Sequence, residues 1–151
     1  MKTSAIAFAA ILGLASAQNA IVNNYCDTTV YVQSFPIDGS DPGPLTTVAE
    51  GGSFTEAFRT SGSTIKMALT KTLDTPLFFG YSFSSTNDYV YYELNTQWGN
   101  PFAASANSLS AGDGCDAFNC AADDPSCYSV TSGQTVYGCP QPVDLTADLC
   151  V

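Results

Sequence analysis

The sequence predicts an all-β fold, an antiparallel β-sandwich or flattened barrel. Apolar and polar residues alternate in several short segments, whereas helical periodicity is scarce. Turn-rich stretches such as PIDGSDPGP (36–44) and AEGGS (49–53) separate these segments. Many short strands between such turns are typical of sandwiches and barrels. Since the sequence shows no internal repeat and no sign of a second domain, one domain is expected.

Three segments show the alternation of a half-buried antiparallel strand most clearly. They are STIKMALT (63–70), DYVYYELN (88–95) and VDLTADLC (143–150). The apolar residues that this alternation turns inward are Ile65, Met67 and Leu69, then Val90, Tyr92 and Leu94, and finally Leu145, Ala147 and Leu149.

Further elements follow from turn residues and β-propensity. Strands are predicted within SFTEAFR (53–59), PLFFGYSF (76–83) and QTVYG (134–138). Asn87-Asp88 lies between two strand candidates and predicts a hairpin. The stretch ASANSLSAGDG (104–114) is small and polar, so we expect a surface loop there.

The first seventeen residues have the pattern of a secretory signal peptide. Lys2 precedes an apolar run, and Ala15-Ser16-Ala17 provides a small-residue cleavage site. The run is too short to span a bilayer, and no other apolar run approaches that length. We therefore expect cleavage after Ala17 and a soluble, secreted mature domain, Gln18–Val151, with no membrane insertion.

Charge and composition exclude several classes of function. The formal net charge of −10 repels nucleic acid and anionic membranes, so no nucleic-acid partner is expected. The chain has no histidine, which removes Ser-His-Asp and Cys-His catalysis and most zinc sites. No metal or other cofactor is expected. The acids nearest the cysteines match no EF-hand spacing; they are Asp113, Asp116, Asp123 and Asp124.

The six cysteines of an exported chain predict three disulfides, although many pairings are possible. Cys26 stands alone near the start, and the next cysteine is Cys115. Asn24-Tyr25-Cys26 is only the rare cysteine form of a glycosylation sequon, so no N-glycan is expected.

Four segments, in the same order along the chain, resemble the thaumatin-like protein family. They are NNYCDTTVYVQ (23–33), YYELNTQWGNPF (91–102), GCDAFNCAADD (114–124) and TVYGCPQPVDLTADLCV (135–151). They are similar to that family's first strand, its Y-D-x-S-x-x-D-G-x-N-x-P stretch, its C-x4-C-A-A-D segment and its closing strands. The large insertion of the plant members is missing after Cys120. The chain therefore resembles the small secreted members of filamentous fungi.

The resemblance implies the disulfides Cys26–Cys150, Cys115–Cys139 and Cys120–Cys127. The first pair would tie the opening strand to the closing one. Because its loop is long, chain entropy assigns it about 4–5 kcal/mol of stability. A monomer is expected.

Many thaumatin-like proteins have an acidic cleft, which is linked to binding or weak hydrolysis of β-1,3-glucan. By position, Glu93 retains one cleft carboxylate, whereas Trp98 replaces a second. Gly80 aligns with a cleft glutamate and Thr64 with a cleft arginine. Glycoside hydrolysis needs two carboxylates. The resemblance therefore favours a protein that is not an enzyme, with Glu93 as the catalytic candidate if it is one.

Other acids could in principle supply the second carboxylate of a catalytic pair. The candidates on neighbouring strands or connections are Glu50, Glu56, Asp74 and Asp88. We interpret them as solvated surface groups.

An outward row of aromatic residues accompanies Glu93. Tyr89, Tyr91 and Glu93 share one strand face, and Trp98 and Phe102 follow. These five residues are the ligand-binding candidates, because a sugar ring stacks on an aromatic face while its hydroxyls bond to a carboxylate. Alternatively, the tyrosines cover a second sheet.

The leading hypothesis is a secreted, non-catalytic domain at the fungal cell wall or host interface that binds a β-glucan-type polysaccharide. The alternatives are a weak endo-β-1,3-glucanase, an effector or adhesin that binds a host extracellular protein, and an antifungal protein.

Overall fold

The structure, a computed structural model, describes residues 18–151. The expected signal peptide, residues 1–17, lies outside the described residues. In the part of the chain that is described, no helix is long and apolar enough to cross a membrane.

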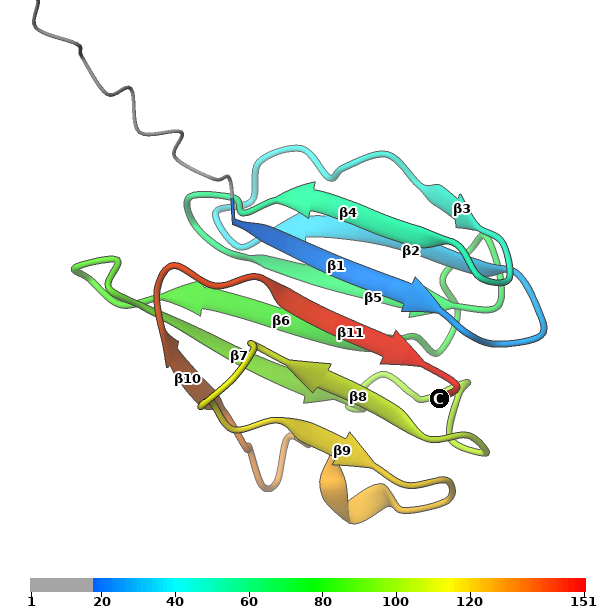
Figure 1. The fold of residues 1–151 in the computed structure, drawn as a ribbon. Coiled ribbons are helices and arrows are strands. Elements are labelled where there is room, and N and C mark those ends of the chain that lie inside the picture. Colours follow the sequence, from blue (N-terminus) through cyan, green and yellow to red (C-terminus); the bar gives the residue numbers. More distant parts are fainter. Residues whose placement is uncertain (1–17) are drawn as a thin grey trace, which may run out of the picture.

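Two sheets face each other across one core (Figure 1). The five-stranded sheet has the order β4-β1-β11-β8-β9, and the six-stranded sheet has the order β10-β7-β6-β5-β2-β3. The strands of the first are β1 (Asn19–Asn24), β4 (Ser53–Ala57), β8 (Asn107–Ser110), β9 (Phe118–Cys120) and β11 (Leu145–Leu149). Those of the second are β2 (Val30–Pro36), β3 (Thr46–Val48), β5 (Ser63–Ala68), β6 (Leu77–Phe83), β7 (Tyr89–Asn95) and β10 (Tyr137–Pro140). One 3-10 turn, η1 (Pro125–Cys127), follows β9.

The prediction of an all-β sandwich is confirmed, and the two sheets remain open rather than closing into a barrel. The sheets are dominated by antiparallel pairs, and one pair of neighbouring strands is parallel. The first and last strands, β1 and β11, lie side by side in parallel, with Ala20 opposite Leu145 and Asn24 opposite Leu149. Parallel neighbours are possible here because nearly the whole chain forms the crossover between them.

The core contains the residues that the alternation turned inward, with one exception. Eight of the nine are at most 1% exposed; they are Ile65, Met67, Val90, Tyr92, Leu94, Leu145, Ala147 and Leu149. Leu69 is 41% exposed, because β5 ends at Ala68 and the alternation ends with it.

Segment 104–114 is not a surface loop, because it contains β8, which lies between β11 and β9 in the five-stranded sheet. Leu109 from this strand is fully buried, and so is Asn107. Asn107 Nδ2 donates to the carbonyls of Phe102 and Ser105 and to the Tyr128 hydroxyl, at 3.0 Å each. A buried amide with its hydrogen bonds satisfied can replace an apolar residue in a strand, which hid this strand from a pattern of apolar alternation.

Three disulfides join Cys26 to Cys150, Cys115 to Cys139 and Cys120 to Cys127, the same pairs that the resemblance implies. No cysteine of the described chain is free. Complete oxidation of this kind is typical of extracellular proteins.

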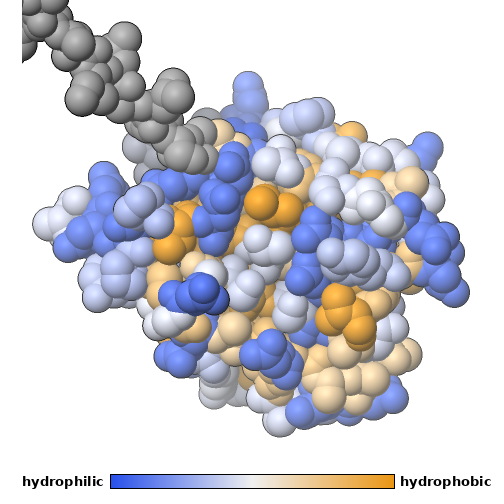
Figure 2. All heavy atoms as spheres, viewed as in Figure 1, coloured by the Kyte–Doolittle hydropathy of each residue, from blue (hydrophilic) through white to orange (hydrophobic). Residues whose placement is uncertain are grey.

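The outer face of the five-stranded sheet carries mostly small and polar side chains. Figure 2, viewed as in Figure 1 with this sheet in front, shows hydrophilic and intermediate residues over most of the face, with small hydrophobic areas between them. Asn23 Nδ2 donates to Asp148 Oδ1 across β1 and β11 at 2.8 Å, and Ser53 Oγ donates to Asn23 Oδ1 at 2.7 Å.

Candidate functional site

The outer face of the six-stranded sheet brings the predicted cleft positions together. Thr64 lies opposite Gly80 in the register of β5 and β6, and Gly80 lies opposite Glu93 in the register of β6 and β7. These three residues, separated in the sequence, therefore form one row across three strands.

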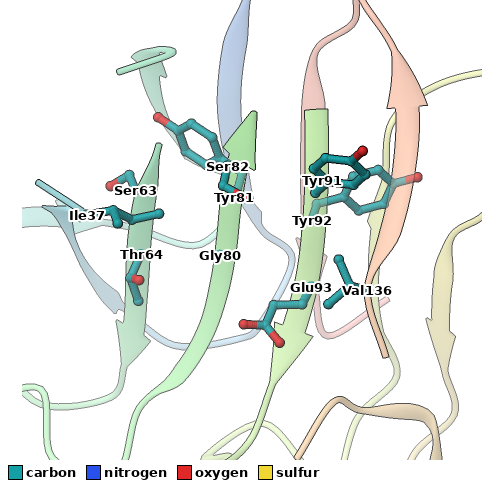
Figure 3. A pocket seen from close by; sticks show the side chains of 10 residues that line it. All are labelled: Ile37, Ser63, Thr64, Gly80, Tyr81, Ser82, Tyr91, Tyr92, Glu93 and Val136. Carbon is teal, nitrogen blue, oxygen red and sulfur yellow. The ribbon is translucent and has the colours of Figure 1, made fainter. Parts of the chain in front are cut away.

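This row lies in a hollow of about 130 Å³, which we call the Glu93 furrow. It is lined by Ile37, Ser63, Thr64, Gly80, Tyr81, Ser82, Tyr91, Tyr92, Glu93 and Val136. Figure 3 shows the Glu93 side chain leaving β7 and reaching toward β6. A Cβ atom on Gly80 would lie 3.5 Å from both Cγ and Oε1 of Glu93, so the missing side chain keeps the furrow open beside that oxygen.

Two hydrogen bonds fix the Glu93 carboxylate. Its Oε2 accepts from Ser129 Oγ at 2.8 Å and from Asn95 Nδ2 at 3.1 Å. The buried Asn95 is held in turn, because its Oδ1 accepts from the Gln97 amide at 2.8 Å. One oxygen is thus used for positioning, while Oε1 faces Gly80 and can bond to a ligand.

No second carboxylate lines the furrow in the described structure. Asp74 accepts from the Thr70 and Thr72 hydroxyls in its own turn. Asp88 accepts from Ser84 and Thr86, and these hydroxyls hold the pKa of its carboxyl below the ordinary value. Glu50 is exposed in the turn between β3 and β4.

Glu56 belongs to a separate polar cluster. Its Oε2 forms a 3.1 Å ion pair with Arg59 Nε and accepts from Ser34 Oγ at 2.7 Å. Tyr81 joins this cluster, because its hydroxyl donates to Glu56 Oε1 at 3.4 Å and accepts from the Arg59 amide at 2.9 Å. Burial raises the pKa of Tyr81 above its ordinary value. Both partners of this ion pair are therefore committed to structure.

On one side of the furrow, two predicted aromatic residues are exposed. Tyr89 and Tyr91 are 41% and 40% exposed, and their rings stack at 6.4 Å between centroids. They point away from the core, so they do not cover a second sheet. Gly138 of β10 lies opposite Tyr91, and a Cβ atom there would be 3.0 Å from Tyr91 Cδ1. Glycine thus lets the Tyr91 ring lie against the neighbouring strand.

On the other side of the furrow, Trp98 packs on the sheet through partners that the sequence did not indicate. Its ring lies 4.7 Å from that of Phe78. The Lys66 Nζ atom lies 4.3 Å from the Trp98 ring and 4.5 Å from the Phe35 ring. Lys66 faces outward in the β5 alternation, but its aromatic neighbours come from long-range pairing, which no local pattern reports.

Phe102 does not belong to this surface. It is 3% exposed and packs in the core. Its amide donates to Asn100 Oδ1 at 3.0 Å in a local turn that directs the ring inward. The exposed row is therefore limited to Tyr89, Tyr91 and Trp98.

One of the acids near the disulfides, Asp124, caps the 3-10 turn η1. Asp124 accepts from the amide and hydroxyl of Ser126 at the start of η1, and these bonds lower the pKa of its carboxyl. Within residues 18–151, no group of three or more His, Cys, Asp or Glu side chains is placed to hold a metal ion.

Comparison with known proteins agrees with this architecture. The family described as Bys1: Blastomyces yeast-phase-specific protein matches residues 7–151. The crystal structure of the protein elicitor MoHrip2 from Magnaporthe oryzae is 58% identical, with a TM-score of 0.88, over 89% of this chain and 100% of that chain. No curated protein matches the sequence.

The structure of the thaumatin-like xylanase inhibitor TLXI is similar at 14% identity, with a TM-score of 0.65, over 87% of this chain and 99% of that chain. At this identity the likeness concerns the fold, which confirms the expected thaumatin-like architecture. The chain therefore has the thaumatin-like fold with three disulfides, and it belongs to the Blastomyces yeast-phase-specific protein family.

Proposed function

We propose that this protein is a secreted, non-catalytic domain that binds a neutral β-glucan-type polysaccharide at the cell wall or host interface. The observation that carries the proposal is one fixed carboxylate, Glu93, in a furrow with exposed aromatic rings on both sides. Tyr91 lines the furrow itself. Trp98 packs on Phe78, which lies in the cross-strand row next to that of Gly80 and Glu93.

This arrangement suits a sugar chain lying across the strands. The apolar face of a pyranose ring packs on an exposed aromatic ring, and its hydroxyls donate to a carboxylate. Glu93 Oε1 is placed for such a bond because Oε2 is already occupied by Ser129 and Asn95. A neutral polymer fits best, because a net charge of −10 repels acidic polysaccharides.

Binding without hydrolysis follows from the same furrow. Glycosidases divide acid and base work between two carboxylates on either side of the scissile bond, and Glu93 is the one carboxylate among the lining residues. We expect no reducing-sugar release from laminarin. Release by the wild type that is lost in Glu93→Gln would instead establish the glucanase alternative.

The direct test is retention on insoluble polysaccharide. The protein is mixed with particulate β-1,3-glucan or with chitin, at low and moderate salt, and the bound fraction is measured. We expect retention on glucan that changes little with salt, because stacking and hydrogen bonds to a neutral polymer release few counterions. If neither polymer retains the protein, the proposal is wrong.

A protein partner is the second candidate, and the relatives favour it. The 58% identical relative is a protein elicitor, and the more distant neighbour is an inhibitor of xylanase, which is itself a protein. The same exposed aromatic surface could contact an extracellular host protein. This candidate would be favoured if glucan does not retain the protein but the protein can be crosslinked to a host extracellular protein. Tyr91→Ala and Trp98→Ala should then abolish the crosslink.

A further inference from the structure

We propose that the mature N-terminus is a pyroglutamate, formed by cyclisation of Gln18 after cleavage behind Ala17. The site lies at the start of β1, in the five-stranded sheet, whereas the row of Thr64, Gly80 and Glu93 belongs to the six-stranded sheet. The inference rests on the expected signal peptide and is independent of any polysaccharide.

The first observation concerns the Gln18 side chain. Its Nε2 atom is the one buried side-chain nitrogen or oxygen without a hydrogen-bond partner in the described structure. Gln18 lines a cavity of about 230 Å³. The other lining residues come mainly from the segment that follows β4 and from the β6–β7 hairpin; they are Phe58, Arg59, Thr60, Phe83, Asn87 and Gln141. A buried donor without a partner is unfavourable, and native structures seldom keep one.

The second observation is that the backbone around Gln18 is fixed. The Phe58 amide donates to the Gln18 carbonyl at 2.8 Å. The next amide, that of Asn19, donates to Asp144 Oδ1 at 2.7 Å. The residue therefore remains attached to the sandwich whatever happens on its N-terminal side.

Cyclisation removes the unpartnered atom itself. Once Gln18 is the first residue, its α-amine attacks the side-chain Cδ, and a five-membered lactam forms. The bond from Cδ to Nε2 breaks, and Nε2 leaves as ammonia with a proton from the α-amine. No oxidant or reductant is needed. The product keeps the Gln18 carbonyl that Phe58 holds, and the charged terminal amine is lost.

The test uses the full chain secreted from a eukaryotic host and analysed without prolonged storage. We expect an intact mass equal to Gln18–Val151 with three disulfides and one ammonia fewer. Edman degradation should give no signal until pyroglutamyl aminopeptidase has acted. That enzyme should release the residue from reduced, unfolded protein and act much more slowly on the native fold, because the backbone on both sides of the first peptide bond is hydrogen-bonded.

Gln18→Asn is the matched control, since it keeps an amide but its side chain is too short for a five-membered lactam. Its intact mass should show no loss of ammonia, and Edman degradation should proceed from residue 18. A wild-type chain with a free amine on Gln18 would overturn the proposal. A mature chain that begins at another residue would overturn it too, without affecting the furrow.

Discussion

The two sheets of the sandwich differ in what their outer faces present. The five-stranded sheet pairs the first and last strands, β1 and β11, and the disulfide Cys26–Cys150 joins the chain just after each of them. Its outer face carries short polar side chains. The six-stranded sheet carries an open furrow and exposed aromatic rings. In this account the first sheet mainly holds the chain together, and the second carries the site.

The difference follows from the residues at outward positions. Across β1 and β11, Asn23 bonds to Asp148, so the polar side chains satisfy one another. Across β5, β6 and β7, a glycine stands between Thr64 and Glu93, so one carboxylate oxygen is left beside empty space. An outer face whose polar groups are already paired offers less to a ligand than one with an open oxygen beside exposed rings.

The largest expected effect is on stability, in the five-stranded sheet. Replacing Cys26 and Cys150 together by alanine should lower the free energy of unfolding by about 4–5 kcal/mol, because the bridge closes a very long loop. The pair Cys120 and Cys127 closes a short loop and should cost about 2–3 kcal/mol. Denaturant titration measures both, and equal losses would show that the β1–β11 bridge has no special role.

Truncating the exposed rings should affect binding more than it affects stability. Tyr91→Ala and Trp98→Ala should each weaken glucan binding by about 1 kcal/mol, or about fivefold in Kd. Thr146→Ala, on the outer face of the other sheet, is the control and should bind like the wild type. Affinities from depletion binding check this order, and an equal loss in the control would remove the distinction between the two faces.

Filling the furrow should also separate binding from stability. In Gly80→Ala the new methyl would make ordinary contacts, 3.5 Å from Glu93 and 3.7 Å from Phe78 Cε2, so the fold should tolerate it. Binding should fall severalfold because the methyl occupies space beside Glu93 Oε1. Gly133→Ala is the control, since its Cβ would meet only Val130 Cγ2, at 4.0 Å. Unchanged affinity in Gly80→Ala would place the ligand elsewhere.

Removing the charge beneath Trp98 should give a smaller loss. Lys66→Met keeps a long stem but no ammonium, and the lost cation–π contacts are worth about 0.5–1 kcal/mol. The indole should become more mobile, so the fluorescence anisotropy of the single tryptophan should fall, together with about a twofold to fivefold loss of affinity. Unchanged anisotropy would mean that Phe78 alone orients the ring.

The smallest effect concerns pH at the β6–β7 hairpin. The Ser84 and Thr86 hydroxyls depress the pKa of Asp88 in the folded chain. The resulting stability is present above the unfolded pKa and is lost as pH falls through the lower, folded pKa. Asp88→Asn should therefore flatten the acid limb of a urea-midpoint curve slightly while leaving glucan binding at neutral pH unchanged. An identical acid limb would contradict this role.

Much of the fold could be predicted from the sequence, because period-two alternation survives wherever one face is buried. It placed Val90, Tyr92 and Leu94 inside and Tyr91 and Glu93 outside. The alternation does not reveal β8, because the hydrogen-bonded Asn107 occupies a core position there. It also extends one residue past the end of β5 and so predicts that Leu69 is buried, whereas Leu69 is exposed.

The site was less predictable, because it depends on which distant strands pair. Alternation gives the outward direction of Glu93 but not the approach of Ser129, which fixes its carboxylate from a loop. The contacts of Lys66 with Phe35 and Trp98 likewise come from long-range register. Phe102 is buried rather than exposed, because a turn and not a strand sets the direction of its side chain.

Chemical shifts recorded while a soluble β-1,3-glucan oligosaccharide is added to the protein would identify directly which face binds the sugar. We expect saturable shifts at Thr64, Gly80 and Glu93 and at the Trp98 indole, with none on the outer face of β1 and β11. Shifts confined to that opposite face, or no shifts at millimolar oligosaccharide, would contradict this expectation.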